Sequence, residues 1–434
     1  MNLQKYEKRL KAVETIQAEG RIAQVIGLIA ESDGPVAQIG ELCFILPDSQ
    51  SDPIPAEVVG FKGERILLMP LAAMQGIKIG SRVLSSGRPR AVAAGPELLG
   101  RILNGLGEPI DDAGIIPPAA FLPLENDPPN PLTRRRIKTP LRLGVRALDC
   151  LLTCGEGQRL GIFAGSGVGK STLLGMIARN TSADINVIAL IGERGREVRD
   201  FIERDLGEEG LKRSVLVVAT SDQPALQRLK GAFVATAIAE YFRDQGMSVL
   251  FMMDSVTRFA MAQREIGLAV GEPPATKGYT PSVFALLPKL LERSGTAERG
   301  AITALYTVLV EGDDFNEPIS DTVRGILDGH IILSRGLAAL NHYPAIDVLE
   351  SVSRLMVEIT DPEHQQAAAQ LREVLATYRS ARDLINIGAY AQGSNPAIDR
   401  AIALNDDVIA FLRQGVFEPA GFEESLERMK GIFR

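Results

Sequence analysis

The chain has 434 residues, of which 45% are hydrophobic and 23% charged, and its formal net charge at pH 7 is -7. This is the composition of a globular protein with room for two or three domains. The acidic balance argues against a dedicated nucleic-acid binder, and no apolar run reaches the roughly 18 residues that a transmembrane helix needs.

The first predicted element is an amphipathic helix at the N-terminus. Leu3, Tyr6, Leu10, Val13 and Ile16 recur at three- and four-residue steps, which is typical of one apolar helix face. This helix either packs on its own domain or docks a partner, and the pattern leaves both open. The segment lacks a signal-peptide core, and three cysteines do not make a disulfide framework, so we expect a cytoplasmic protein.

The pattern of apolar and turn-forming residues changes between residues 20 and 88. Short apolar runs at 22–29, 41–46, 57–60 and 65–69 are separated by Gly, Asp, Ser and Pro, which predicts a small antiparallel β-barrel. A proline-rich extended connection follows at 109–131, and we interpret the nearby Arg134-Arg135-Arg136 as a solvated charge run.

From residue 141 to about 355, strand-like runs alternate with helical stretches, as in a parallel sheet flanked by helices. We expect buried strands at 159–163, 186–191, 214–219, 248–253, 301–310 and 330–333, and helices that include 231–245. Cys150 and Cys154 lie in this region and are expected to be buried cysteines rather than metal ligands. The remaining chain is predicted to be helical at 365–384, 396–403 and 406–413.

Four regions are therefore predicted along the chain. They are an N-terminal helix at 1–19, a β-barrel domain at 20–88, a parallel-sheet domain at 89–355 and a helical domain at 356–434. The fold class is α/β, with the barrel before the sheet and the helices after it.

The segment 164–171 reads Ala-Gly-Ser-Gly-Val-Gly-Lys-Ser, between a predicted strand and a helix at 172–179. Backbone amides of such a turn cradle phosphate oxygens at the helix N-terminus, and its glycines allow close approach. Lys170 would add charge to the outer phosphates and Ser171 a hydroxyl for Mg²⁺. Ala164 departs from the strict pattern, which is tolerated if its φ is negative. The predicted nucleotide-binding residues are Gly165, Ser166, Gly167, Val168, Gly169, Lys170, Ser171 and Thr172.

Two acidic residues follow predicted strands. Asp254 ends the strand at 248–253 and is placed to reach Mg²⁺, mostly through water, although it could instead cap a helix before Ser255. Glu193 follows the strand at 186–191 and is the candidate to polarise an attacking water. Together these residues predict Mg²⁺-dependent hydrolysis of ATP.

Several segments resemble one known superfamily. Gly192-Glu193-Arg194, the phosphate loop and 344–353, Pro-Ala-Ile-Asp-Val-Leu-Glu-Ser-Val-Ser, together resemble the hexameric ATPases related to the rotary ATP synthase. The last segment is similar to that superfamily's ten-residue signature. Within the superfamily, 253–267 and 278–285 are most similar to the ATPases of type III protein export, and more to the flagellar members than to those of virulence systems. The resemblance covers nearly the whole chain.

The resemblance implies a β-barrel, a RecA-like ATPase domain and a helical C-terminal domain, and it implies roles for individual residues. Glu193 matches the catalytic glutamate, and Arg354 matches an arginine that reaches into the neighbouring subunit's site. Tyr343 matches the aromatic residue that stacks on adenine. Phe417 matches a residue that lines the same pocket, although the spacing around it differs from that of the rotary subunits. The implied catalytic set is Lys170, Glu193 and Arg354. Arg194 and Arg258 are implied helpers of the site.

The resemblance also implies partners. They are five further copies of the chain in a homohexamer, an export-apparatus regulator or stator protein at the N-terminal helix, export substrates with their chaperones, and the membrane export gate. The location would be the cytoplasm, peripheral to the inner membrane, with no nucleic acid bound.

Four alternatives stay open at this point. A virulence export ATPase or a rotary catalytic subunit would carry the same catalytic residues. An RNA-dependent hexameric motor would need aromatic and basic residues in the barrel, yet 21–88 holds only the aromatics Phe44 and Phe61. A non-hydrolysing structural subunit would lack a residue such as Glu193.

Overall fold

The computed structural model describes residues 19–434 apart from 48–51, 311 and 313. The predicted N-terminal helix lies outside the described residues. The chain forms two compact units. The first contains the barrel together with Gln223–Gln227 and Ala262–Ser282, and the second contains the sheet and the C-terminal helices.

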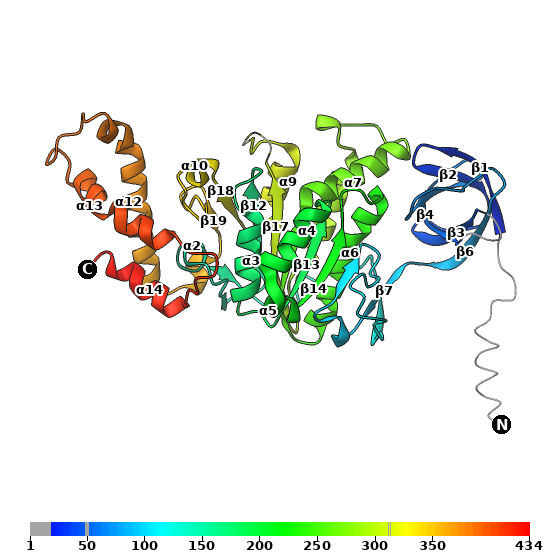
Figure 1. The fold of residues 1–434 in the computed structure, drawn as a ribbon, viewed down its shortest axis with the longest axis horizontal. Coiled ribbons are helices and arrows are strands. Elements are labelled where there is room, and N and C mark those ends of the chain that lie inside the picture. Colours follow the sequence, from blue (N-terminus) through cyan, green and yellow to red (C-terminus); the bar gives the residue numbers. More distant parts are fainter. Residues whose placement is uncertain (1–18, 48–51, 311, 313) are drawn as a thin grey trace, which may run out of the picture. The chain divides into compact units, whose positions relative to one another are not determined.

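The first unit is built on a closed six-stranded antiparallel barrel in the order β1-β2-β5-β4-β3-β6 (Figure 1). Its strands are β1 (Glu19–Ile26), β2 (Ile29–Asp33), β3 (Glu41–Leu46), β4 (Ile54–Lys62), β5 (Arg65–Pro70) and β6 (Arg82–Pro89). Alternate residues of β3 are buried, which is the two-residue period of a strand with one face on a core. The predicted barrel is confirmed. The predicted strand at 22–29 is two strands, because Gly27 has a φ of 57° and turns the chain there.

The second unit is built on a mostly parallel sheet in the order β19-β18-β12-β17-β15-β13-β14-β8 (Figure 1). The strands are β8 (Ile102–Asn104), β12 (Arg159–Ala164), β13 (Ile185–Ile191), β14 (Ser214–Ala219), β15 (Ser248–Asp254), β17 (Ala301–Leu309), β18 (Gly329–Leu333) and β19 (Val352–Ser353). Shorter strands are β7 (Ala91–Ala94), β9 (Ala120–Pro123), β10 (Pro140–Leu141), β11 (Cys154–Gly155) and β16 (Gly295–Thr296).

The predicted parallel sheet and its six central strands are confirmed. Every residue of β13 and β14 is buried, because a parallel sheet is covered on both faces and its strands are continuous apolar runs. The edge strands β8 and β19 were not predicted, because two or three residues are too few to show the alternation of apolar and polar residues that marks a strand. Among them β19 is the one that matters for the site, because it leads directly into Arg354.

The helices of the two units, up to the end of the sheet, are α2 (Arg146–Leu151), α3 (Lys170–Asn180), α4 (Gly195–Asp200), α5 (Gly207–Lys212), α6 (Ala225–Asp244), α7 (Val256–Ala269), α8 (Pro281–Leu291), α9 (Pro318–Ile326) and α10 (Arg335–Ala339). Single turns lie at η1 (Pro96–Leu98), η2 (Phe201–Leu206) and η3 (Thr276–Gly278). Within the described ranges, no helix combines the length and the apolar character needed to span a bilayer.

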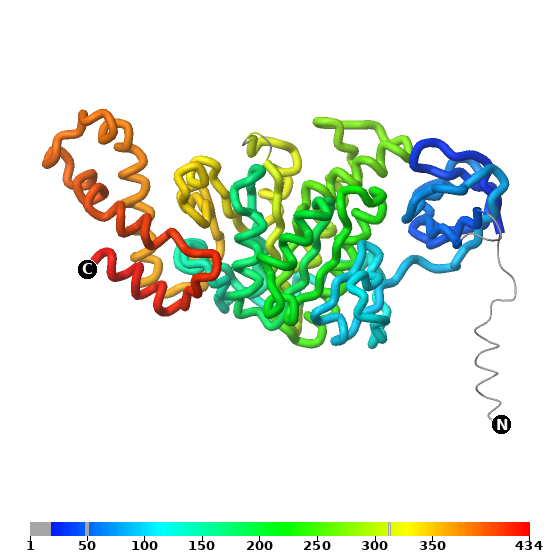
Figure 2. Tube along the Cα trace, viewed as in Figure 1, coloured from blue at the N-terminus to red at the C-terminus, as the bar shows by residue number. Residues whose placement is uncertain are grey.

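The C-terminal part of the second unit is helical, as predicted. It contains α11 (Met356–Ile359), α12 (Pro362–Asn386), α13 (Pro396–Leu412) and α14 (Phe422–Gly431). The tube in Figure 2 shows α12 and α13 packed side by side, which agrees with their extensive contacts. The two predicted helices at 396–403 and 406–413 are one helix, α13, so the predicted break is wrong. The helix continues through the half-buried Asn405 and the exposed Asp406.

The prediction that Arg134-Arg135-Arg136 is a solvated charge run is wrong for Arg134, whose side chain is 18% exposed, whereas Arg135 and Arg136 are exposed. Arg134 Nη1 donates to the carbonyl of Ser294 at 2.8 Å. Arg135 donates to the carbonyls of Ala297 and Gly300 at 3.2 and 2.9 Å. The guanidinium groups therefore bind backbone oxygens and attach the extended connection to the sheet domain.

The three cysteines are buried and form no disulfide, as predicted. Cys150 lies in α2 and Cys154 in β11, so they do not share a helix face. Burial raises the pKa of Cys43 to about 12 and raises the pKa values of the other two thiols as well. All three are therefore protonated, unreactive core residues.

Candidate active site

The phosphate loop joins β12 to α3 at the carboxyl edge of the sheet. Ala164 ends β12 in an extended strand conformation, and its φ is not positive. Its departure from the strict pattern therefore causes no strain. Gly167 and Gly169 have φ values of 79° and 90°, a region that side chains disfavour. The helix begins at Lys170, so the free amides of its first turn face the loop.

Lys170, Glu193 and Asp254 meet at this edge, although 84 residues separate the first from the last. Lys170 forms an ion pair with Asp254, and its Nζ lies 3.5 Å from Oε1 of Glu193. β12, β15 and β13 run parallel, so their carboxyl ends open on one side of the sheet. The side chains of Lys170, Glu193 and Asp254 are only 11%, 16% and 4% exposed. The cluster is therefore poorly solvated and its charges interact strongly.

A residue from a fourth strand completes the cluster. Thr307 of β17 donates its hydroxyl to Oδ1 of Asp254 at 2.7 Å. β17 lies between β12 and β15 in the sheet, so Thr307, near the carboxyl end of β17, lies at the same edge as Asp254. Thr307 is marked by no sequence motif. Its strand neighbours follow only from the sheet order, which the sequence does not specify.

Burial and neighbouring charges set the protonation of the cluster. Burial, the charge of Asp254 and a hydrogen bond with Glu197 raise the pKa of Glu193 to about 7, against the opposing charge of Lys170. Burial lowers the pKa of Lys170, but Asp254 and Glu193 outweigh it and the net direction is upward. Lys170 therefore stays charged, and Glu193 titrates near neutral pH, where a general base is most effective.

The oxygen donors suit a small divalent cation. The Asp254 carboxylate and the Ser171 hydroxyl are hard oxygen ligands, which Mg²⁺ prefers. Within the described residues, no group of three or more His, Cys, Asp or Glu side chains forms a metal cage. Such a site is typical of Mg²⁺ that is held by one or two protein oxygens and by substrate phosphates.

A cavity of about 650 Å³ opens beside the loop. It is lined by Gly192, Glu193, Arg194, Glu197, Arg204, Ser221, Arg258, Leu309, Val310, Gly312, Arg335 and the residues of 164–172 except Val168, which is buried in the hydrophobic core. This volume falls within the range of small-molecule sites, and the lining has more cationic than anionic side chains. A polyanionic ligand such as a nucleoside triphosphate is complementary to this cationic lining.

Two of the lining arginines lie against glycines. A Cβ at Gly165 would meet the Arg335 guanidinium at 2.6 Å, and one at Gly192 would meet Arg258 at 2.7 Å. Only glycine at these positions admits the arginines so close to the loop. Arg258 was anticipated by resemblance. Arg335 was missed, and the available signal was its position just after β18, at the same carboxyl edge.

The two aromatic residues proposed for the adenine pocket come from segments that are tied to the loop. A Cβ at Gly169 would lie 3.5 Å from the Tyr343 ring. The Gln414 amide donates to the Tyr343 carbonyl at 3.0 Å, and Phe417 follows three residues later. Phe417 stacks under Arg179 of α3 at 4.9 Å. Both rings are accessible, at 40% and 73% exposed, as an aromatic stacking surface requires.

Arg354 is not part of this cluster. β19 pairs with β18 so that Ser353 lies opposite Gly329, the first residue of β18. Arg354 is thus at the amino edge of the sheet, whereas the phosphate loop is at the carboxyl edge. β12 crosses the sheet in six residues, so the two edges are about 20 Å apart. An arginine side chain cannot span that distance, so Arg354 does not serve its own chain's site.

Comparisons with known proteins agree with this architecture. Residues 22–87 match the beta-barrel domain and residues 144–353 the nucleotide-binding domain of the ATP synthase alpha/beta family. Residues 360–431 match the C-terminal domain of the type III secretion ATPase EscN. The match of the helical region to the secretion ATPases decides against a rotary catalytic subunit.

Individual relatives are similar over almost their whole lengths. The flagellum-specific ATP synthase of Bacillus subtilis is 58% identical over 98% of this chain and 97% of its own. The assembled ATPase EscN of enteropathogenic E. coli is 48% identical, with a TM-score of 0.91 over 96% of this chain and 100% of its own. EscN in complex with its central stalk EscO gives 47% identity and a TM-score of 0.89, with the same coverage. The chain therefore belongs to the ATPases of flagellar and type III secretion export, within the ATP synthase alpha/beta family.

Proposed function

We propose that this ATPase hydrolyses ATP with Mg²⁺ at the carboxyl edge of its sheet. The observation that carries the proposal is the buried contact of Lys170 with both Asp254 and Glu193 beside the glycine-rich loop. Lys170 and the loop amides hold the phosphates. Glu193 accepts a hydrogen bond from the attacking water and orients it in line with the γ-phosphate.

Ser171 and Asp254 are the residues that would hold the cation. A bound Mg²⁺ would offset the negative charge that develops on the phosphate oxygens. Thr307 keeps the Asp254 carboxylate in one orientation through its hydroxyl. Tyr343 and Phe417 hold the adenine by stacking, which leaves the phosphates to the loop.

The site is completed by a second copy of the chain. Arg354 is exposed at the amino edge, and a planar cation there would stabilise charge on the phosphoryl group of a neighbouring subunit. A ring closes such head-to-tail contacts, and we propose a homohexamer. The relative EscN was solved as an assembled ATPase, and this likeness supports assembly of the present chain.

A shared site makes activity depend on assembly. We expect the specific activity per chain to rise steeply with protein concentration and to level off once rings form. The measurement is steady-state ATP hydrolysis over a dilution series, with the assembly state followed by sedimentation in the same buffer with Mg²⁺. A constant rate per chain at concentrations where the chain sediments as a monomer would contradict the shared site.

We further propose that ATP use serves flagellar protein export at the cytoplasmic face of the inner membrane. The greater identity to the flagellum-specific relative than to EscN supports the flagellar system over a virulence system. The proposed partners are export substrates and their chaperones, the membrane export gate, and a regulator or stator protein at residues 1–18. The complex of EscN with its central stalk supports a further partner in the ring.

The proposed partner at the N-terminus is tested by removing its binding segment. We expect the full chain to capture export-apparatus proteins from a native lysate, and a chain that lacks residues 1–18 to lose one of them. The ATPase rate of the shortened chain serves as the folding control. Capture of the same proteins by both chains would contradict a docking role for this segment.

A further inference from the structure

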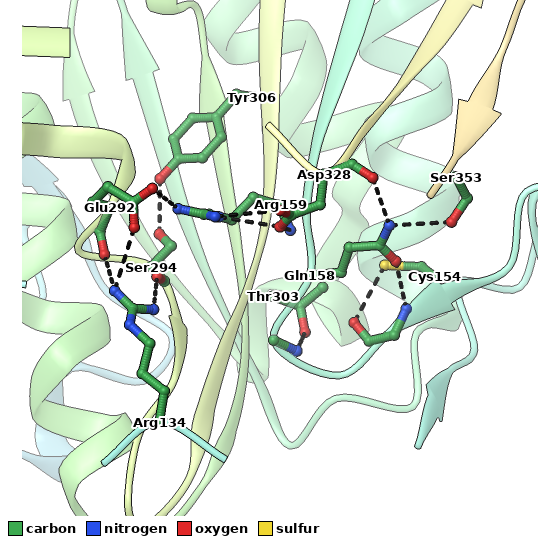
Figure 3. A network of polar contacts seen from close by, with 12 residues as sticks. Arg134, Cys154, Gln158, Arg159, Glu292, Ser294, Thr303, Tyr306, Asp328 and Ser353 are labelled. Carbon is green, nitrogen blue, oxygen red and sulfur yellow. Dashed lines mark hydrogen bonds and ion pairs between the residues drawn. The ribbon is translucent and has the colours of Figure 1, made fainter. Parts of the chain in front are cut away.

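The segment that ends in Arg354 is held by a buried network of polar contacts at the amino edge of the sheet. Figure 3 shows this network, in which Gln158, Asp328 and Ser353 converge from three separate parts of the chain. The Arg354 amide itself donates to the Asp328 carbonyl at 3.1 Å. The backbone at Arg354 is therefore fixed on both sides, by Ser353 before it and by Asp328 beside it.

Gln158 is the centre of the network. Its side-chain Nε2 donates to the Asp328 carbonyl at 3.2 Å and to the Ser353 hydroxyl at 3.1 Å. Its Oε1 accepts from the Gly155 amide at 2.8 Å. The Gln158 side chain is fully buried, and its bond from the Gly155 amide is buried as well, which shields that bond from competing water. Ser353 in turn donates to the Thr153 carbonyl at 2.8 Å.

The same network reaches the strand that carries the phosphate loop. Asp328 accepts from the backbone amide and Nε of Arg159, both at 3.1 Å. Arg159 is the first residue of β12, and the last residue of β12 leads into the loop. The contacts continue from Arg159 to Glu292, and Glu292 is paired with Arg134. One rigid strand therefore links the surroundings of Arg354 to the chain's own phosphate site.

The Arg354 side chain contrasts with its backbone. It is exposed, and among the described residues (19–434 apart from 48–51, 311 and 313) its guanidinium forms no hydrogen bond or ion pair. A cation with a fixed backbone and a free end can be presented to another molecule. We propose that Gln158, acting through Ser353 and Asp328, is a positioning residue that sets the placement of Arg354 in the neighbouring subunit's site.

This inference rests on the proposed shared site, and it adds a requirement for the backbone of Arg354. Displacement of a catalytic group by about 1 Å can cost about 10²-fold in rate. A two-residue strand such as β19 is too short to hold a loop by its ladder alone. The side-chain bonds of Gln158 and Ser353 supply the missing restraint.

The first test replaces the buried amide by an apolar group of similar size. We expect Gln158→Leu to lower kcat by about 10- to 100-fold while KM for ATP changes by less than about threefold. Asn186→Leu is the matched control, because Asn186 of β13 is also a fully buried amide, and it donates to the Ala178 carbonyl of α3 and to the Ser214 hydroxyl of β14. We expect the control to affect stability and to leave kcat per folded chain within about threefold.

The deciding test uses mixed rings. Gln158→Leu chains keep an intact Glu193, and Glu193→Gln chains keep an intact network and Arg354. In a random 1:1 mixture we expect about a quarter of the wild-type rate per chain, because half of the chains are competent and about half of those meet an intact arginine. If Gln158 served only its own chain's loop, mixing would restore nothing, and that result would overturn the inference.

Ser353 variants provide a second test that does not depend on the folding of the Gln158→Leu chain. Ser353→Ala removes one bond partner of Gln158 and should show the same rescue in mixed rings, whereas Ser353→Thr keeps the hydroxyl and should retain most of the activity. Arg354→Ala is mixed with Glu193→Gln in parallel. Absence of rescue there rejects the shared site itself. Rescue there, without rescue of the Gln158 and Ser353 variants, rejects only the positioning role.

Discussion

Replacement of Arg354 by Ala should lower kcat by about 10³- to 10⁵-fold, which is the usual contribution of an arginine that stabilises phosphoryl transfer. KM for ATP should change little, because the arginine stabilises charge that develops on the phosphoryl group only in the transition state. The measurement is steady-state hydrolysis at saturating ATP and above the concentration at which rings form. Nucleotide affinity, measured by equilibrium binding, should stay near that of the wild-type chain.

Two variants sharpen the interpretation of that loss. Arg354→Lys keeps a positive charge but lacks the planar fork, so it should recover only a small part of the rate. Arg382→Ala removes another exposed arginine of the same unit and should leave kcat within about twofold. An Arg354→Ala enzyme that keeps a tenth or more of the wild-type rate would be incompatible with the proposed role. So would a loss that intact Arg354 from Glu193→Gln chains does not restore.

Replacement of Glu193 by Gln should lower kcat by about 10²- to 10⁴-fold, the range expected for loss of a general base. The side chain keeps its shape, and it loses the charge that lies 3.5 Å from Lys170. ATP should bind at least as tightly as before, because a negative charge beside the phosphates has been removed. Glu203→Gln is the matched control, since it makes the same change on an exposed residue outside the cavity.

The pH profile gives an independent check on Glu193. Its pKa is raised to about 7, so below pH 7 the carboxyl group is protonated and cannot accept the water proton. We therefore expect kcat/KM of the wild-type enzyme to fall about tenfold per pH unit below this value, and to level off above it. The residual rate of Glu193→Gln should lack that acid limb.

ATP itself loses a proton near neutral pH. A further variant must therefore show whether the acid limb comes from Glu193 or from the substrate. Glu197 helps to raise the pKa of Glu193 through a hydrogen bond and through its charge. Glu197→Ala should therefore shift the limb to lower pH, whereas the titration of ATP stays where it is. An unshifted limb would assign it to the substrate and remove this support for Glu193 as the base.

The two edges of one sheet divide the proposed work between neighbouring subunits. The carboxyl edge holds the phosphates and the water, and the amino edge presents Arg354 to the next chain. β12 runs from one edge to the other, with Gln158 before its first residue and the phosphate loop after its last. Hydrolysis in one site and the placement of an arginine in the next are thus attached to a single strand.

Much of the architecture could be predicted because its signals are local. The barrel strands show the two-residue alternation, and the buried strands of the sheet are continuous apolar runs that end in acids or glycines. The phosphate loop, Asp254 and Glu193 each follow such a run. Parallel strands bring their carboxyl ends to the same edge, so the strand pattern alone is enough to expect these residues together.

Other features had no local signal. The sequence predicted a break between residues 403 and 406, but α13 continues through it from Pro396 to Leu412. Arg134 and Arg135 read as surface charge, yet they bind backbone carbonyls 160 and 162 residues away. Side-chain partners at such separations depend on packing, which a pattern within one segment does not specify.

By itself the sequence determined the chemistry of the phosphate loop, the two acids that follow their strands, and the family. Only the tertiary structure decided which groups lie together at the proposed nucleotide site, because that depends on strand order and on the edge where each segment ends. It placed Thr307 and Arg335 at the site, neither of which any motif marks. It placed Arg354 about 20 Å away. The physical reason is that charge and hydrogen bonding act over a few ångströms in space, whatever the separation along the chain.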